Sequence, residues 1–167
     1  MEIEKKFLVQ QLPADLTQYE VWKIEQGYLC TTKPVLRIRR KNQDYILTYK
    51  SPMPTDTELN IANETELSLT KEAFEHLKTK CDGLMIKKDR YLIPYKQWTI
   101  ELDVFHGHCE GFCMAEVEFS SVEESQIFSP PSWFGKDVSG NYQYSNSYLS
   151  QGKNLPWQTN PAKGNRS

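Results

Sequence analysis

The chain has 167 residues, enough for roughly one domain, and its 20 Lys and Arg residues nearly balance its 22 Asp and Glu residues, which leaves a formal net charge of -2. This balance excludes a nucleic-acid binder that works through bulk positive charge, and no apolar run is long enough for a transmembrane helix, so we expect no nucleic-acid or membrane partner. The N-terminus lacks the apolar run of a signal peptide, so we expect a cytoplasmic protein whose four Cys residues are free thiols.

Alternation of apolar and polar residues predicts a mainly β (α+β) domain that spans residues 1–152. Short strands at this spacing favour an antiparallel barrel or a sandwich. The predicted strands cover residues 1–9, 20–30, 35–41, 44–51, 62–69, 85–93, 98–105 and 113–120.

A few helices are expected beside the strands. Residues 71–82 form the clearest one, because Thr70 can cap its start. Ser121 opens a second helix with a capping-box pattern, and a short third one covers about 143–151. Residues 153–167 are rich in Asn, Pro, Gly and Lys, and we expect a flexible tail there.

Charged residues occupy alternate positions of nearly every predicted strand, and neighbours on one strand usually share a sign. On a single strand this pattern is compatible with the solvated outer face of an ordinary sheet. Like charges two positions apart repel, however, so their repetition over seven strands favours a closed barrel with a charged interior and an apolar outer face, covered by helices, a partner subunit or a loop. The charged face comprises Glu2, Glu4, Lys6, Arg37, Arg39, Lys41, Lys50, Glu64, Glu66, Lys88, Arg90, Glu101, Asp103, Glu116 and Glu118.

A barrel interior with both signs of charge needs a ligand that satisfies both. Arg and Lys bind phosphate oxygens, and Arg can do so with two hydrogen bonds. Carboxylates bind hard cations such as Mg²⁺ or Mn²⁺, which bridge to phosphates. The pattern therefore predicts a small polyanion bound together with a divalent metal.

The segment Glu2-Ile3-Glu4-Lys5-Lys6 resembles the ExExK signature of the triphosphate tunnel metalloenzymes, or CYTH superfamily. The likeness covers residues 1 to about 150 and continues, in the family's order, through Leu36-Arg37-Ile38-Arg39, Lys88-Asp89-Arg90, Glu101-Leu102-Asp103 and Glu116-Val117-Glu118. It implies a closed eight-stranded antiparallel β-barrel, the triphosphate tunnel, with a few flanking helices. It also implies metal-dependent hydrolysis of inorganic triphosphate to pyrophosphate and phosphate, as in the short bacterial members.

The resemblance also implies roles for individual residues. The implied metal ligands are Glu2, Glu4 and Glu118, with Glu116 and Asp103 for a second ion. The implied substrate-binding residues are Lys6, Tyr28, Arg37, Arg39, Lys50, Lys88 and Arg90. The implied catalytic residues, which hold the attacking water or orient the basic groups, are Lys6, Glu64, Glu66, Asp103 and Glu116, with Glu101 ranked below Asp103.

Two other classes of function stay open. The same tunnel serves adenylate cyclases and nucleoside or thiamine triphosphatases, and a non-catalytic polyphosphate-binding module is a further alternative. Glu2, Glu4 and Glu118 argue against a pure binder, because binding alone needs few carboxylates. Mg²⁺ or Mn²⁺ is the expected cofactor, and the resemblance implies a homodimer.

Two local features depart from this interpretation. Gln143 stands where family members often carry a basic residue before Tyr-x-Asn, which leaves open how firmly the C-terminal helix plugs the tunnel and whether it helps to bind one phosphate. His106, His108, Cys109 and Cys113 offer four zinc ligands within eight residues. Because two of them are adjacent and all come from one segment, a plain hairpin loop with free Cys is the favoured interpretation.

Overall fold

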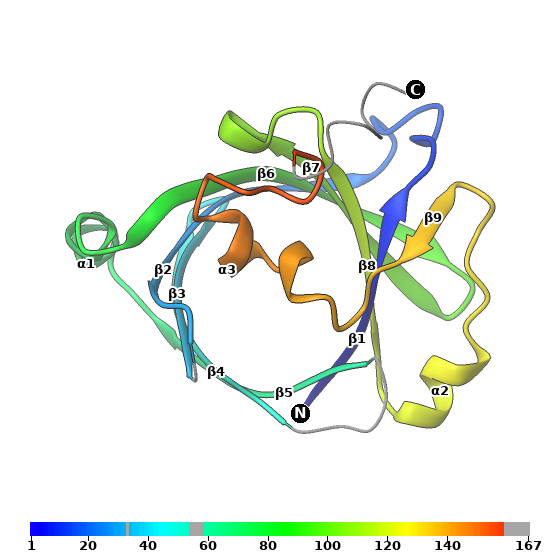
Figure 1. Ribbon diagram of the computed structural model, residues 1–167, viewed down its shortest axis with the longest axis horizontal. Helices are drawn as coiled ribbons and strands as arrows, with labels where there is room; N and C mark the ends of the chain where they lie inside the picture. The colour runs from blue at the N-terminus through cyan, green and yellow to red at the C-terminus, as the bar shows by residue number, and fades with distance from the viewer. Residues whose placement is uncertain (33, 54–58, 159–167) are drawn as a thin grey trace.

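The computed structural model describes residues 1–32, 34–53 and 59–158. Eight strands form one antiparallel sheet in the order β5-β4-β3-β2-β6-β7-β8-β1, and the pairing of β1 with β5 closes it into a ring (Figure 1). The prediction of a closed eight-stranded barrel is confirmed, and every predicted strand is present with bounds within three residues. The strands are β1 (Glu2–Val9), β2 (Glu20–Cys30), β3 (Val35–Lys41), β4 (Asp44–Pro52), β5 (Asn60–Ser68), β6 (Asp82–Tyr95), β7 (Trp98–His106) and β8 (Cys113–Phe119).

Strand β1 has three neighbours. It pairs with β8 along most of its length, with β5 over Glu2–Glu4, and with an additional strand β9 (Phe134–Asp137) near its other end. Strand β9 was not predicted, because its four residues are too few to show an alternating pattern. The ring is therefore closed by a short seam between β1 and β5.

The helices are short and begin where they were predicted. Thr70 accepts a hydrogen bond from a backbone N–H at the start of α1 (Lys71–Lys78), and Ser121 does the same for α2 (Val122–Ile127). Helix α1 ends earlier than expected, because β6 begins at Asp82. The third predicted helix is split into a 3-10 turn, η2 (Tyr142–Tyr144), and α3 (Asn146–Leu149), and a further turn, η1 (Gly107–Cys109), joins β7 to β8. Within the described residues, no helix is long and apolar enough to cross a membrane.

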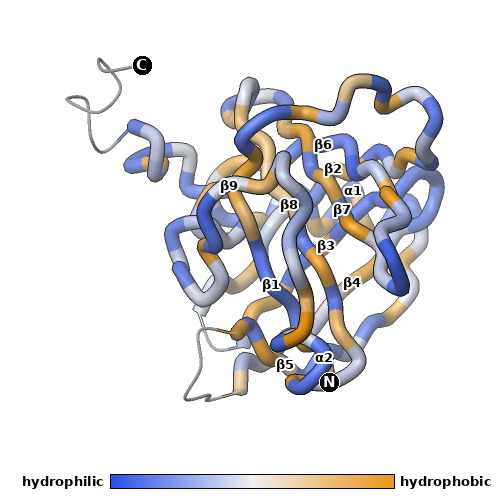
Figure 2. The backbone as a smooth tube through the Cα atoms, turned by 90° about the vertical axis from the view of Figure 1, so that its right-hand side faces the viewer, coloured by the Kyte–Doolittle hydropathy of each residue, from blue (hydrophilic) through white to orange (hydrophobic). Residues whose placement is uncertain are grey.

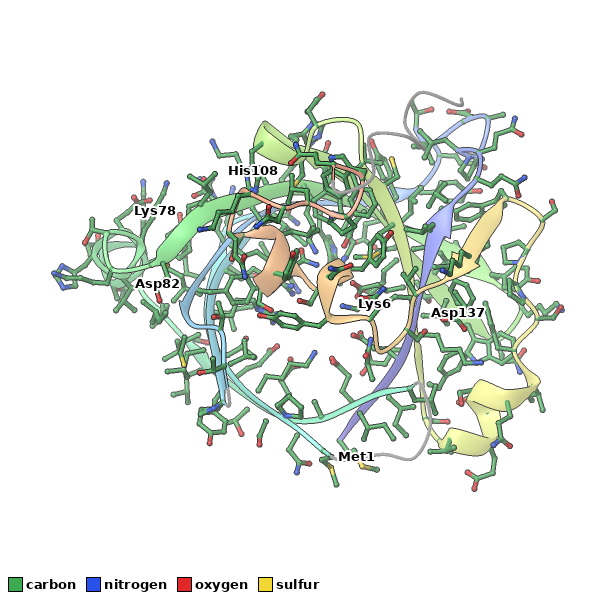
Figure 3. The ribbon with its side chains drawn as sticks, viewed as in Figure 1. Met1, Lys6, Lys78, Asp82, His108 and Asp137 are labelled. Carbon is green, nitrogen blue, oxygen red and sulfur yellow. The ribbon has the colours of Figure 1, made fainter. Side chains whose placement is uncertain are left out.

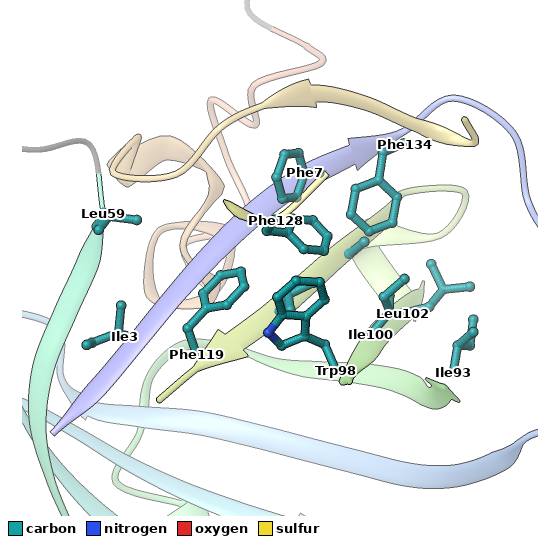
Figure 4. Close-up of a cluster of buried hydrophobic side chains, with 12 residues drawn as sticks. Ile3, Phe7, Leu59, Ile93, Trp98, Ile100, Leu102, Phe119, Phe128 and Phe134 are labelled. Carbon is teal, nitrogen blue, oxygen red and sulfur yellow. The ribbon is translucent and has the colours of Figure 1, made fainter. Parts of the chain in front are cut away.

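The main apolar core lies outside the ring. It packs between the outer faces of β1, β7 and β8 and the covering segment that holds α2 and β9 (Figure 4). Phe7 points outward from β1, with its ring centroid 5.9 Å from that of Phe128 and 4.8 Å from that of Phe134. Figure 2 shows the alternation of hydrophobic and hydrophilic residues along the strands that produces this arrangement. We call the following buried set the outer core: Ile3, Phe7, Leu59, Ile93, Trp98, Ile100, Leu102, Ala115, Val117, Phe119, Phe128 and Phe134.

The expected flexible tail is partly ordered. Leu155 is buried in a second apolar cluster with Leu149 of α3 and Phe105 of β7. Trp157 stacks on Phe112, with ring centroids 4.4 Å apart. A loose tail is thus wrong for residues 153–158, because two apolar side chains in a polar stretch dock on the barrel, and residues 159–167 lie outside the described residues.

Candidate functional site

A cavity of about 1070 Å³ runs through the ring, and charged side chains from most of the strands line it. Figure 3 shows side chains that point from the ring toward its centre, among them Lys6. The cavity brings together most of the residues that the sequence analysis singled out: Glu2, Glu4, Lys6, Tyr28, Arg37, Arg39, Lys50, Glu64, Lys88, Arg90, Glu101, Glu116 and Glu118.

The basic residues are concentrated on one side, from β3 and β6, which flank β2. We call Arg37, Arg39, Lys88 and Arg90 the basic wall. The Nη2 of Arg37 donates to Thr48 Oγ1 at 3.2 Å, while its buried Nε has no hydrogen-bond partner within the described part of the chain. Burial, together with the charges of Arg37 and Arg90, lowers the pKa of Arg39. Within the described residues Arg37 and Arg39 form no ion pair, whereas Lys88 pairs with Asp103, and Arg90 pairs with Asp103, Glu101 and Glu116. An anion in the cavity would therefore stabilise Arg37 and Arg39 above all.

Asp103 lies behind the basic wall rather than in the cavity. Its side chain is fully buried, and its oxygens accept from Lys88 Nζ at 2.7 Å and from Arg90 Nε and Nη2 at 2.7 and 2.9 Å. Although burial alone would raise the pKa of Asp103, Arg90 and Lys88 outweigh it and lower that pKa. The geometry corrects the prediction of Asp103 as a metal ligand, because both of its oxygens are already bound by cations.

Carboxylates from β1, β5, β7 and β8 dominate the rest of the lining, and two of them, Glu101 and Glu116, contact Arg90 of the basic wall. We call Glu2, Glu4, Glu64, Glu101, Glu116 and Glu118 the acidic wall. Glu4 and Glu118 are direct cross-strand neighbours on β1 and β8, so two like charges face the cavity together. Burial and Glu116 raise the pKa of Glu4 to about 7, and burial with the nearby carboxylates of Glu2 and Glu101 raises that of Glu118. The six carboxylates of this wall outnumber the cations that pair with them, which among the described residues are Lys6, Lys50 and Arg90.

Lys6 and Lys50 form ion pairs with carboxylates of the acidic wall. The Nζ of Lys50 is 2.7 Å from Glu2 Oε1, and that of Lys6 is 3.8 Å from Glu4 Oε1 and 3.9 Å from Glu116 Oε1. Burial alone would raise the pKa of Glu116, but Lys6 and the basic wall hold it well below its usual range.

The acidic wall has the chemistry of a divalent-cation site, since it offers several crowded carboxylate oxygens to a hard cation. Across residues 1–32, 34–53 and 59–158, however, no three His, Cys, Asp or Glu side chains converge closely enough to hold a metal as they stand. Binding a cation would therefore require the wall's side chains to rotate toward one another.

The two histidines among the possible zinc ligands of the β7–β8 hairpin contact other protein groups. The ring nitrogens of His106 lie 3.1 Å from Asp89 Oδ2 and 3.2 Å from Glu110 Oε2, and His108 Nε2 donates to the carbonyl of Leu149 at 2.8 Å. All four Cys residues are free. Among the described residues, no three possible ligands converge at this hairpin, and a hairpin loop with free Cys stays the favoured interpretation.

One expectation about the end of the tunnel needs correction. Glu66 is exposed and does not line the cavity, because β5 pairs with β1 only up to Ala62 and the rest of the strand diverges from the seam.

Gln143 is exposed and lies outside the cavity, yet the C-terminal segment still enters the barrel (Figure 1). The segment therefore reaches the tunnel without a basic side chain at position 143.

Two uncharged residues at the site were not predicted. Gln26 is fully buried on β2, and its Oε1 accepts from Arg39 Nε at 2.8 Å. Asn146 of α3 accepts from Lys88 Nζ at 2.9 Å. Gln26 could have been found from its alternation with Tyr28, and Asn146 from its place in the Tyr-x-Asn motif.

The comparisons with known proteins agree with this geometry. Residues 1–130 match the model of the CYTH domain. The chain belongs to the CYTH family. It is 36% identical to an inorganic triphosphatase of Nitrosomonas europaea over 153 residues, which is 89% of this chain and 96% of that protein. It is 33% identical to an inorganic triphosphatase of Acetivibrio thermocellus over 150 residues, 89% of this chain and 92% of that protein.

A solved crystal structure of an inorganic triphosphatase superposes on this CYTH protein with a TM-score of 0.66. The two chains are 34% identical, and the match covers 90% of this chain and 95% of the other. Triphosphatases of the CYTH family generally depend on a metal. The acidic wall is the part of this tunnel whose chemistry fits such an ion.

Proposed function

We propose that this CYTH protein is an inorganic triphosphatase that hydrolyses tripolyphosphate to pyrophosphate and phosphate with Mg²⁺ or Mn²⁺. The observation that carries the proposal is one cavity in which Arg37 and Arg39 form no ion pair with the described residues, while burial and neighbouring carboxylates raise the pKa of Glu4 and Glu118. A metal-bound triphosphate supplies an anion to the two arginines and a cation to the two glutamates. The inorganic triphosphatases to which the chain is similar over nearly its whole length support the same activity.

In this proposal the basic wall holds the phosphate oxygens. Arg37 and Arg39 lie two positions apart on the same face of β3 and present their guanidinium groups to the cavity. A phosphate oxygen would give the Nε of Arg37, which has no hydrogen-bond partner among the described residues, an acceptor. Asp103 fixes Lys88 and Arg90 from behind, so that these side chains lose little further entropy when the substrate binds. Lys50, Lys6 and Tyr28 complete the phosphate contacts.

Glu2, Glu4 and Glu118 would hold the divalent ion, and Glu116 stands next to them for a second one. The ion neutralises phosphate charge and polarises the phosphorus–oxygen bonds. Burial raises the pKa of Glu4, so a bound cation would also relieve the cost of ionising this side chain.

Hydrolysis needs no nucleophilic side chain. The transition state of phosphoryl transfer is loose, so positioning and charge stabilisation supply most of the rate. Water attacks a terminal phosphorus in line with the leaving pyrophosphate, and Glu64 and Glu116 accept hydrogen bonds that orient it. Lys6, beside Glu116, stabilises charge on the terminal phosphate.

The decisive experiment measures phosphate release from tripolyphosphate, ATP and thiamine triphosphate, each with Mg²⁺ and with Mn²⁺. We expect tripolyphosphate to have the highest kcat/KM by at least tenfold. Faster turnover of ATP or thiamine triphosphate would reassign the tunnel to an organic triphosphate. Tight binding of all three without turnover would support a binding module instead.

The expected homodimer belongs to the proposal as well. The outer face of β4 and β5 exposes Tyr49 and Leu67, which are 48% and 60% accessible, although α1 packs on β3 and on the Tyr45 end of β4. Light scattering on a sizing column tests it, and a monomer at micromolar concentration would contradict it.

A further inference from the structure

A chain of buried hydrogen bonds connects the basic wall through uncharged side chains. Asn146 Oδ1 accepts from Lys88 Nζ at 2.9 Å and from Gln26 Nε2 at 3.3 Å. Gln26 in turn accepts from Arg39 Nε at 2.8 Å, and its Nε2 also donates to Tyr28 Oη at 2.9 Å. Two amide side chains, Asn146 and Gln26, therefore join Lys88 of β6 to Arg39 of β3, although β2 separates the two strands.

Asn146 reaches this place because the chain after it is anchored to the barrel. The carbonyl of Ser150 accepts from the backbone N–H of Leu84 at 2.7 Å, and that of Leu149 accepts from His108 Nε2 at 2.8 Å. Gly83 lets the backbone come this close, since its φ is +68° and an added Cβ would lie 2.4 Å from the Ser150 oxygen. The position of Asn146 is thus set by β6 and η1, not by contacts inside the tunnel alone.

The hydrogen bonds of Lys88 explain why its acceptor on α3 is the amide of Asn146 and not a carboxylate. A lysine ammonium has three donors, and Asp103 and Asn146 take two of those on Lys88, which leaves the third for a ligand in the cavity. A second carboxylate in place of Asn146 would fix the ammonium equally well but would cancel its charge toward a phosphate. A neutral acceptor holds Lys88 in place and leaves the positive charge of its ammonium group free to attract a phosphate.

We propose that Asn146 is a positioning residue for triphosphate binding, which holds Lys88 and, through Gln26, Arg39 in register with the phosphates. The C-terminal segment of residues 138–152 then completes the basic wall, because it brings Asn146 into the tunnel. This inference rests on the proposed function.

The first test is a double-mutant cycle read by calorimetric binding of tripolyphosphate and by kcat/KM. Asn146→Ala should weaken binding about tenfold and raise KM more than it lowers kcat. In a Lys88→Met background the same change should cost less than threefold, whereas in a Lys50→Met background it should again cost about tenfold. Equal losses in both backgrounds would overturn the inference, because a merely loosened segment weakens every background alike.

The second test uses Asn146→Asp and needs no change at Lys88. This substitution keeps the shape and the acceptor, so a purely structural role predicts a smaller loss of binding than for Asn146→Ala. A positioning role that depends on a neutral acceptor predicts a larger loss, since the added charge offsets that of Lys88. The reverse order would overturn the inference.

Gln143→Ala is the matched control, because Gln143 belongs to the same segment but its side chain lies outside the cavity. It should leave binding unchanged, and melting without ligand shows whether each variant is folded. Calorimetry does not require turnover. If the wild type released no phosphate, the proposed function would be contradicted, but the double-mutant cycle could still be measured through the binding of tripolyphosphate.

Discussion

The outer core and the tunnel are built on opposite faces of the same strands. On β1, Ile3 and Phe7 point into the outer core, while Glu4 and Lys6 point into the cavity. The outer core is apolar and densely packed with aromatic rings, so it stabilises the fold. The tunnel holds buried like charges that face one another, which costs stability and is retained for binding. In this barrel the side that faces inward serves chemistry and the side that faces outward serves folding.

Metal removal should give the largest difference between the two regions, because it should abolish activity in the tunnel and leave the stability of the outer core almost unchanged. With excess EDTA, hydrolysis of tripolyphosphate is expected to fall to background, because the acidic wall then has no cation to present to the phosphates. The melting temperature of the ligand-free protein should stay within a few degrees, since the outer core contains no metal ligand. Full activity in EDTA would rule out the metal-dependent mechanism.

Substitutions on the two faces of β1 should give opposite phenotypes. Glu4→Gln removes one metal-directed charge and should lower kcat/KM at least about a thousandfold, with unchanged or higher stability, because a buried carboxylate is lost. Phe7→Ala opens a cavity beside Phe128 and Phe134 and should cost about 3–5 kcal/mol of unfolding free energy. Urea unfolding and initial rates check both. A large stability loss in Glu4→Gln would show that the tunnel also holds the fold.

Adjacent arginines on β3 sharpen the comparison at constant charge. Arg39 lines the cavity, while Arg40 is exposed and donates from Nε to the carbonyl of Asn42 at 2.9 Å. Arg39→Ala should reduce kcat/KM about a hundredfold through the loss of a phosphate contact. Arg40→Ala should change it less than twofold and cost at most about 1 kcal/mol of stability. Comparable losses in the two variants would contradict the register of β3.

The pH dependence of stability gives the smallest effect. Burial and Glu116 raise the pKa of Glu4 from 4.5 to about 7 in the folded protein, so between these values the folded state retains a proton that the unfolded state has lost. The metal-free, ligand-free protein should therefore lose about 2–3 kcal/mol of stability as pH rises from 4.5 to 7. Glu101 and Glu118 act in the same direction.

Urea unfolding of Glu4→Gln across this range isolates the contribution of Glu4, and the slope should become shallower. An identical slope in the variant would mean that Glu4 ionises normally in the folded state.

Strand alternation and the sign of the charges were sufficient to predict which face of each strand lines the tunnel. They do not predict how deeply each charged side chain is buried below the surface of the cavity. Asp103 alternates in phase with Glu101, yet two cations cover it, and this depends on the length of Lys88 and Arg90 and not on the pattern. Glu66 was placed in the tunnel because the strand was treated as uniform, whereas β5 leaves the seam after Ala62.

The C-terminal region was the least predictable part. Residues 153–158 read as polar, and only the surface formed by Phe112 and Leu149 makes Leu155 and Trp157 dock. The hydrogen bonds of Asn146 depend on anchors at Gly83, Leu84 and His108, which are far away in the sequence. Tertiary contacts of this kind leave no periodic signal in a single sequence.

The partners of β1 also determine when the protein can fold. Its first residues pair with β8 and β5, as Ile3 does with Phe119 on one side and Ile61 on the other. Strand β1 therefore gains its second neighbour, and the ring closes, only after β8 has emerged from the ribosome. Until then one edge of β1 is open to other chains. Such long-range pairing slows folding, and we expect a nascent barrel that stays open and relies on chaperones until its last large strand has been made. The glutamates at the start of the chain would then be among the last parts of the tunnel to reach their positions.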